Sequence, residues 1–186
     1  MFFLGHAILD TAFYFKKPCY EVFSMAVYQE NPVSYKQNYA DLKKFSQAAC
    51  QTSNPDIIWS IAKVESNFNF KIVGIEGKNI LKTDSDINEY LKKAKKDSNF
   101  DLGPMQINWK YHASKSGYPA RYFFDGSFSV YYVTQNILGG IVKSCKQNWV
   151  SCYHSFNSQE GNRYKTRIFN ADQKLRIDLK KMITSS

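Results

Sequence analysis

The sequence predicts a mainly helical domain with at most a small β-hairpin or lip. Hydrophobic side chains recur at helical spacing along most of the 186 residues, and capping residues stand where those segments begin. Hydrophobic residues make up 44% of the chain and aromatic residues 16%, which suits a packed core rather than a disordered chain. No internal repeat or low-complexity linker divides the sequence. We therefore expect one globular unit, in which residues 1–49 form an N-terminal segment that packs on a domain of residues 50–186.

The first half of the chain predicts two helices. Residues 32–50 carry apolar side chains at near-helical steps. Residues 52–56 then have the composition of a helix start, with a capping residue, a proline in the first turn and an acid near the positive helix end. We expect this second helix to end at residues 67–69. Its apolar stripe runs through Ile57, Ile58, Ile61, Ala62 and Phe68.

The second half combines one short extended segment with four further helices. Residues 71–83 are punctuated by glycine, which indicates a hairpin or lip. Asp84 or Ser85 is expected to cap a helix through residue 96. Ser127 is expected to cap a helix over 128–145, in which Gly139-Gly140 allows a neighbouring helix to approach closely. A short helix capped by Asn148 and a last helix over 164–182 complete the prediction.

The charge balance narrows the range of partners. The chain carries 25 Lys and Arg against 16 Asp and Glu, a formal net charge of +9. A basic surface favours a polyanion such as nucleic acid, anionic lipid or an acidic wall polymer. The sequence has no zinc-ligand spacing, basic-region heptad or RNA-binding aromatic motif, so a nucleic-acid module is disfavoured. No stretch is long enough to span a bilayer.

Four cysteines permit two disulfides in three possible connectivities. We favour Cys19–Cys50 and Cys145–Cys152, because each closes a local loop, over the alternative of four buried thiols in a cytosolic protein. Bridged cysteines indicate an oxidising compartment. The three histidines do not cluster with the cysteines, and we expect neither a metal nor a cofactor. Residues 1–15 are apolar but lack a positive n-region, so they make a poor signal peptide.

Glu65 is the most informative residue. It stands where the apolar stripe of the helix that starts at residues 52–56 normally takes an aliphatic side chain. An ionised carboxylate at such a position costs several kcal/mol, in rough terms, unless it is paired or protonated. A half-buried glutamate with a raised pKa is what general acid catalysis near neutral pH requires. The structural alternative is a glutamate in an ion pair or at the rim of the core.

Two downstream segments carry polar groups suited to sugar recognition. Gly103-Pro104 predicts a turn, followed by an adaptable apolar contact at Met105 and an amide at Gln106. Asn157 is a neutral amide that suits an N-acetyl group, and Tyr153 and Tyr164 offer stacking or hydrogen-bonding walls. Each of these residues taken singly is more often structural than functional.

Together, residues 64–69 (VESNFN), 103–108 (GPMQIN) and 156–158 (FNS) with Tyr164 resemble the three motifs of the lysozyme-like lytic transglycosylases. Those motifs are Glu-Ser with a following aromatic, Gly-Leu-Met-Gln-Ile, and Tyr-Asn-x-Gly with a later Tyr. The resemblance covers roughly residues 50–170. The long insert that ends in Asn-Phe-Asp-Leu-Gly resembles the specialised transglycosylases of type IV secretion systems. The sequence departs from the family pattern at Pro104, Phe156 and 158–159.

The resemblance implies a goose-type, lysozyme-like helical fold and a transglycosylase domain at 50–186. It implies that Glu65 protonates the bond between N-acetylmuramic acid and N-acetylglucosamine and then deprotonates the C6 hydroxyl, giving a 1,6-anhydro end without water. Ser66, Met105, Gln106, Tyr153, Asn157 and Tyr164 are the implied substrate-binding residues. Peptidoglycan strands in the periplasm would be the substrate, and secretion-system components the further partners.

Three other functions compete with this one. A hydrolytic lysozyme would need a second carboxylate, for which Asp101 and Glu76 are the nearby candidates by sequence. A non-catalytic module that binds wall glycan is the second alternative. A basic nucleic-acid-binding protein is the third.

Overall fold

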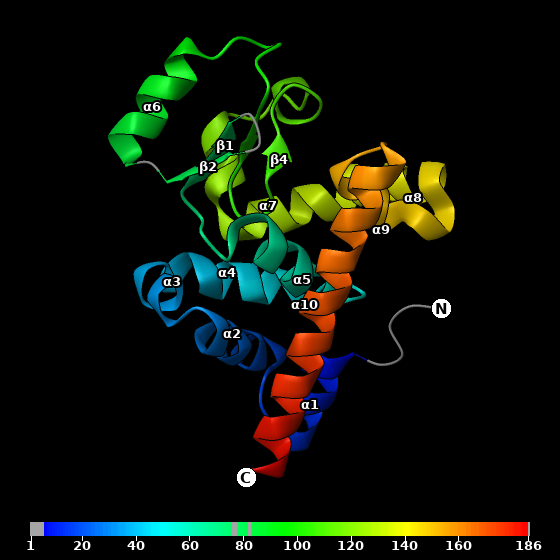
Figure 1. The fold of residues 1–186 in the computed structure, drawn as a ribbon. Helices are drawn as coiled ribbons and strands as arrows, with labels where there is room; N and C mark the ends of the chain where they lie inside the picture. Colours follow the sequence, from blue (N-terminus) through cyan, green and yellow to red (C-terminus); the bar gives the residue numbers. More distant parts are fainter. Residues whose placement is uncertain (1–5, 76–77, 82, 186) are drawn as a thin grey trace.

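The computed structural model describes residues 6–75, 78–81 and 83–185. The expectation of a mainly helical protein is confirmed (Figure 1). The α-helices are α1 (Ala7–Phe15), α2 (Cys19–Glu30), α3 (Pro32–Gln37), α4 (Tyr39–Ala49), α5 (Pro55–Ser66), α6 (Asp84–Lys93), α7 (Gly126–Tyr132), α8 (Gly139–Cys145), α9 (Trp149–His154) and α10 (Ser158–Thr184). Short helical turns are η1 (Ala113–Lys115), η2 (Ala120–Phe124), η4 (Lys146–Asn148) and the π-helical η3 (Val133–Leu138). The strands are β1 (Ile72–Ile75), β2 (Lys78–Leu81), β3 (Phe100–Leu102) and β4 (Ile107–Asn108).

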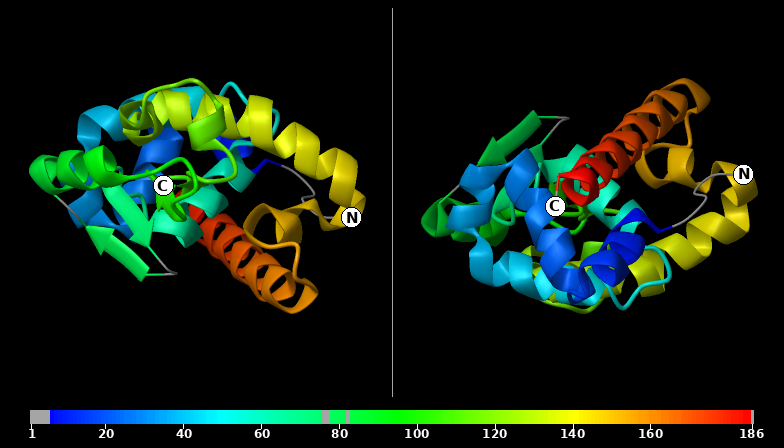
Figure 2. Two further views of the ribbon diagram at one scale, coloured as in Figure 1. Left: turned by 90° about the horizontal axis from the view of Figure 1, so that it is seen from above. Right: turned by 90° about the horizontal axis from the view of Figure 1, so that it is seen from below.

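The helices pack around one hydrophobic core. Helix α4 runs along α7, and α10 packs against α5, α9 and α1. Helix α8 and the start of α10 extend from the same side of the molecule, with α9 between them (Figure 2). Aromatic side chains fill much of the centre; Phe23, Phe45, Trp59, Phe70 and Phe123 are among those with almost no exposed surface.

The β-structure is larger than the predicted hairpin. Strands β1 and β2 form that hairpin, but β3 and β4 extend it into a four-stranded antiparallel sheet in the order β2-β1-β3-β4. The register pairs Asp101 of β3 with Gly74 on one side and Asn108 on the other. The sheet and α6 lie at the end of the molecule away from α1 (Figure 1). Strands of three and two residues are too short to show an alternating pattern in the sequence.

Several predicted helix boundaries are wrong, and each has a local cause. The helix expected over 32–50 breaks at Asn38, whose side-chain amide donates to the carbonyl and the hydroxyl oxygens of Ser34. Thr83, not Asp84 or Ser85, caps α6. Asp125, not Ser127, caps α7, because its carboxylate accepts the backbone N–H of Phe128.

The last part of the chain needs three further corrections. The glycine pair 139–140 admits no neighbouring helix, because a Cβ built on either residue would meet no atom within 4 Å. Asn148 stands at the start of α9 but makes no side-chain capping bond. Helix α10 begins six residues before the predicted Tyr164, because Asn157 caps it by accepting the backbone N–H groups of Gln159 and Glu160.

Both predicted disulfides, Cys19–Cys50 and Cys145–Cys152, are present. The first ties the start of α2 to the end of α4, and the second ties the end of α8 to α9. Such bridges are typical of proteins in an oxidising compartment. Within the described part of the chain, none of the helices combines the length and apolar character that a bilayer crossing demands.

Candidate active site around Glu65

Glu65 lies in the last turn of α5, and the sequence-predicted start of this helix is confirmed. The Asn54 side chain accepts the backbone N–H of Ile57 at 3.2 Å, and Pro55 occupies the first turn. The helix ends at Asn67, which adopts a left-handed conformation with φ 51°. The residues that precede Glu65 on the apolar stripe are buried, whereas Glu65 itself keeps part of its surface exposed. A carboxyl group therefore stands at the edge of the core.

The surroundings of Glu65 favour its protonated form. Burial is the largest effect and raises the pKa of Glu65 from 4.5 to about 7. The nearby Asp101 carboxylate also raises this pKa, while the Tyr164 hydroxyl and the Arg167 guanidinium lower it. Near neutral pH a substantial fraction of Glu65 holds a proton, which is the state that a general acid needs.

Tyr164 and Tyr153 form the helical wall beside Glu65. Tyr164 is fully buried, and its hydroxyl interacts with the Glu65 carboxyl group. The two tyrosine rings stack with centroids 6.1 Å apart, and His154 stacks on Tyr164 at 4.9 Å. Because rings packed in this way have little rotational freedom, the Tyr164 hydroxyl stays directed toward the carboxyl group.

The turn at residues 103–106 is fixed next to this wall. Gly103 has φ 70°, and a Cβ there would lie 1.9 Å from the backbone oxygen of Phe123. The Gln106 side chain donates to the Gly103 carbonyl at 2.9 Å, and the Tyr153 hydroxyl donates to the Met105 carbonyl at 2.9 Å. The side chain of Met105 is fully buried, so this residue packs inside the site. The bond between Tyr153 and Met105 thus joins the second motif to the helix α9 that precedes the third motif.

Asp101 places a second carboxyl group near Glu65. It lies on β3, where burial raises its pKa and a 2.8 Å hydrogen bond from the Asn108 amide opposes that rise. Its charge acts on Glu65, so the two acids belong to one electrostatic unit. Glu76, the other candidate for a second carboxylate, lies outside the described residues.

Two predicted site residues have structural bonds of their own. The Ser66 hydroxyl is buried and donates to the Ala62 carbonyl at 3.1 Å. Asn157 is exposed, and its side-chain oxygen caps α10, which leaves its amide NH2 group for other partners.

Sequence reasoning missed two side chains of the site. The Arg167 guanidinium lies 5.4 Å from the centre of the Tyr164 ring, and His154 stacks on the same ring. Arg167 follows Tyr164 by three residues, a spacing that puts both on one helix face, so its position was accessible from the pattern once α10 was placed. Among the described residues, no group of three His, Cys, Asp or Glu side chains gathers closely enough to hold a metal ion.

Comparison of the chain with protein-family models, with curated proteins and with solved structures finds no match.

Proposed function

We propose that this protein is a peptidoglycan lytic transglycosylase of lysozyme-like fold in which Glu65 is the general acid and base. The observation that carries the proposal is a partly exposed glutamate with a pKa of about 7, beside Tyr164 of the third motif and Tyr153, whose hydroxyl bonds the Met105 carbonyl of the second. A carboxylic acid that is protonated at neutral pH and accessible to a substrate can donate to a glycosidic oxygen. The two disulfides support export, and we propose the periplasm as the location.

The reaction needs one acid and no water. The Glu65 proton moves to the glycosidic oxygen, and the bond from this oxygen to the anomeric carbon of N-acetylmuramic acid breaks. The carbonyl oxygen of the sugar's own 2-acetamido group bonds to that carbon and takes up the positive charge. Glu65, now a carboxylate, removes the C6 hydroxyl proton, and the C6 oxygen displaces the acetamido oxygen. The product carries a 1,6-anhydro ring, and Glu65 is protonated again.

The neighbouring residues take positioning roles in this proposal. Tyr164 hydrogen-bonds Glu65 when the carboxylate forms, which stabilises the charged half of the cycle. Tyr153 holds the turn that carries Gln106, and Gln106 presents its amide to the glycan. The Asn157 amide NH2 group, which the cap of α10 does not use, donates to the acetamido oxygen. Secretion-system components remain the proposed further partners.

Asp101 favours a second candidate function, a hydrolytic lysozyme. Most glycosidases use two carboxyl groups, one as acid and the other as nucleophile or base. Asp101 is half-buried, hydrogen-bonded to Asn108 and close enough to Glu65 for its charge to act on it, so it is the candidate for the second group. In that reaction a water molecule enters and the product ends in an ordinary reducing sugar.

Mass spectrometry of the fragments released from purified peptidoglycan separates the two candidates. A transglycosylase gives anhydro ends, which are lighter than hydrolysed ends by one water. We expect Glu65→Gln to reduce cleavage by at least about 100-fold, because it removes both proton transfers at almost constant size. Asp101→Asn should keep anhydro products if the enzyme is a transglycosylase and should abolish cleavage if it is a hydrolase. Undiminished cleavage by Glu65→Gln would contradict both.

The non-catalytic alternative makes a different prediction. A glycan-binding module would retain wall binding but would leave no clearing in a gel that contains peptidoglycan. The same gel loaded with the Glu65→Gln variant shows whether any clearing depends on the proposed acid.

A further inference from the structure

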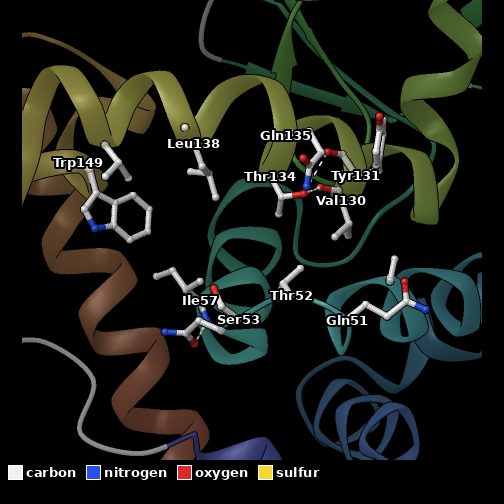
Figure 3. A pocket seen from close by; sticks show the side chains of 14 residues that line it. Gln51, Thr52, Ser53, Ile57, Val130, Tyr131, Thr134, Gln135, Leu138 and Trp149 are labelled. Atoms are coloured by element: carbon white, nitrogen blue, oxygen red, sulfur yellow. Dashed lines mark hydrogen bonds between the residues drawn. The ribbon is translucent and has the colours of Figure 1, made fainter.

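A groove of about 800 Å³ lies at the start of α5, at the end of the helix away from Glu65 (Figure 3). Its wall residue Ile57 precedes Glu65 by eight positions, which corresponds to about 12 Å along the helix axis. The groove is thus a different place from the candidate active site. Its lining consists of Ala48, Gln51, Thr52, Ser53, Asn54, Ile57, Val130, Tyr131, Thr134, Gln135, Leu138, Gly139, Val142 and Trp149.

The lining of this groove carries no charge at neutral pH. This is unusual in a chain with 25 Lys and Arg and 16 Asp and Glu. Side chains with neutral amide or hydroxyl groups come from the loop between α4 and α5, from α7 and from η3. Apolar side chains face the same space from η3 (Leu138), α5 (Ile57) and α9 (Trp149) (Figure 3). A polyanion would find no cation in this lining. A neutral ligand with polar and apolar faces would find both hydrogen-bonding groups and apolar surface.

The chemistry of the lining matches an N-acetylated sugar. A pyranose ring has an apolar C–H face, which an indole and aliphatic side chains can cover, and a rim of hydroxyl groups. Amides such as those of Gln51 and Gln135 can both donate to and accept from hydroxyl and acetamido groups. Tryptophan combines a large apolar surface with a single N–H donor, which suits such mixed ligands.

The position of Gly139 supports a binding role for the groove. Glycine inside a helix lowers helix stability relative to alanine, so a glycine kept there usually allows another group to pack closely against the helix. No such packing exists here, because a Cβ at Gly139 would meet no atom within 4 Å. Gly139 does line the groove, so any larger side chain would occupy ligand space. The preceding η3 is a π-helical turn, a feature common at functional sites.

The far wall of the groove is held in place covalently. Trp149 is the first residue of α9, and the Cys145–Cys152 disulfide ties α9 to the end of α8. The bridge therefore limits how far the backbone at Trp149 can move away from α8, which carries Gly139. We propose that this groove binds an uncharged N-acetylhexosamine oligosaccharide at a site separate from Glu65. The proposal does not depend on the cleavage reaction, since a binding module could use the same groove.

The test is a titration of the Glu65→Gln protein with tetra-N-acetylchitotetraose, followed by NMR of the tryptophan indole N–H groups. The chain has three tryptophans, and Trp149→Phe assigns the relevant signal. We expect the Trp149 signal to shift in a saturable way, while that of the fully buried Trp59 stays in place. Cleavage of peptidoglycan by the native protein is measured separately, so failure of one proposal leaves the other standing.

Gly139 and Gly140 provide a matched pair of variants. Both positions have open space around a new Cβ, but only Gly139 belongs to the groove lining. Gly139→Leu should fold normally and weaken saccharide binding at Trp149 by at least about tenfold. Gly140→Leu should bind like the parent protein. An unmoved Trp149 signal at saturating saccharide, shifts confined to residues around Glu65, or equal binding by the two glycine variants would each overturn the proposal.

Discussion

At the level of single residues, the proton on Glu65 depends on a balance of neighbours. Burial and the Asp101 carboxylate favour the neutral acid, while Tyr164 and Arg167 favour the carboxylate. Asp101 lies on β3, whereas Tyr164 and Arg167 lie on α10, so the pKa of Glu65 depends on how these two elements pack beside α5. A group that must both donate and accept a proton works best when neither state is strongly disfavoured. A pKa of about 7 satisfies this condition near neutral pH.

Substitutions at Asp101 and Arg167 should move this pKa in opposite directions. Asp101→Asn removes a negative charge, so the pKa of Glu65 should fall. Arg167→Gln removes a positive charge, so the pKa of Glu65 should rise. Carbon-13 NMR of the Glu65 carboxyl group measures both shifts without reference to activity. Arg163→Gln, an exposed change one turn earlier on α10, is the control and should have little effect. Shifts of the same sign would contradict the assignment.

The raised pKa of Glu65 also makes stability depend on pH. The folded protein holds the Glu65 proton up to about pH 7, whereas the unfolded chain releases it near 4.5. The folded state therefore binds more protons between these values, and the free energy of unfolding falls as pH rises through this window. Glu65→Gln lacks this loss. The free energy of unfolding of Glu65→Gln, measured relative to that of the native protein, should therefore rise between pH 5 and pH 8. The expected rise is about 1–2 kcal/mol, a value reduced because Glu65 is partly exposed.

Urea unfolding of both proteins at several pH values checks this expectation. The difference in unfolding free energy between variant and native protein should be nearly constant below about pH 4.5 and grow above it. A difference that does not change with pH would mean that Glu65 ionises as freely in the folded protein as in the unfolded chain.

The sequence was sufficient to find the centre of the site but not its electrostatic surroundings. Glu65 was visible because a carboxylate interrupts an apolar stripe, and Tyr153, Tyr164 and Met105 follow from the motif order. Asp101 was visible only as one of two possible second acids, since its distance from Glu65 depends on how β3 pairs with its neighbours. Arg167 and His154 both contact the Tyr164 ring, and the Arg167 charge also acts on Glu65, but these relationships become visible only when α9 and α10 are placed beside Glu65.

At the level of elements, the turn over 103–106 is the most constrained part of the site. Gly103→Ala should destabilise the protein by about 3 kcal/mol or more, because the new methyl group would collide with the Phe123 backbone oxygen at a left-handed φ. Gly117→Ala is a matched control: its φ is 78°, but nothing lies within 4 Å, so only about 1 kcal/mol is expected. Thermal unfolding of the two variants gives the comparison. Equal losses would show that the collision is relieved by movement of the η2 backbone.

The elements that sequence reasoning placed well have strong local signals. Helix α5 has a side-chain cap, a proline in its first turn and a long apolar stripe, and its predicted start is confirmed. Its end was predicted at residues 67–69 but lies at Ser66, because Asn67 and Phe68 adopt left-handed backbone conformations. The errors occur where neighbouring polar residues compete for one role. Thr83 caps α6 through reciprocal bonds with Asp86, although Asp84 and Ser85 were equally plausible by type. At Asn38, a side-chain bond to Ser34 interrupts an apolar pattern that continues on both sides.

At the level of the whole molecule, α10 connects the candidate site to the N-terminal helices. Its 27 residues span about 40 Å. Its first half carries Tyr164 and Arg167 beside Glu65. Its later part carries Asp172 and Arg176, and Arg176 bonds Asp56, which accepts from the backbone of α1. Lys174 of α10 and Lys63 of α5 both pair with Glu30 at the end of α2. The helix that holds the tyrosine wall is therefore anchored by residues far from the site.

Asp56 is the central anchor of this arrangement. It is completely buried, and its carboxylate accepts the backbone N–H groups of Ala7 and Ile8 at 2.6 and 3.0 Å. Arg176 bonds the same carboxylate at 3.3 Å and also bonds Asp172. The Asp56 side chain, at the start of α5, thus joins the first turn of α1 to the later part of α10. Removal of one member of such a buried, hydrogen-bonded group leaves the others unpaired, which is more costly than loss of a surface pair.

We therefore expect Asp56→Asn to lower the free energy of unfolding by about 2–4 kcal/mol, because the amide NH2 group cannot accept from the α1 backbone. Asp84→Asn removes an equally charged but exposed residue, paired with Lys71, and should change stability by less than about 0.5 kcal/mol. Urea unfolding measures both. Hydrogen exchange should show earlier opening of α1 in Asp56→Asn. The pKa of Glu65 should stay near 7, because Asp56 holds the helices together, and the pKa of Glu65 depends on burial and on other side chains. A variant as stable as Asp84→Asn would show that α1 is held by its apolar contacts alone.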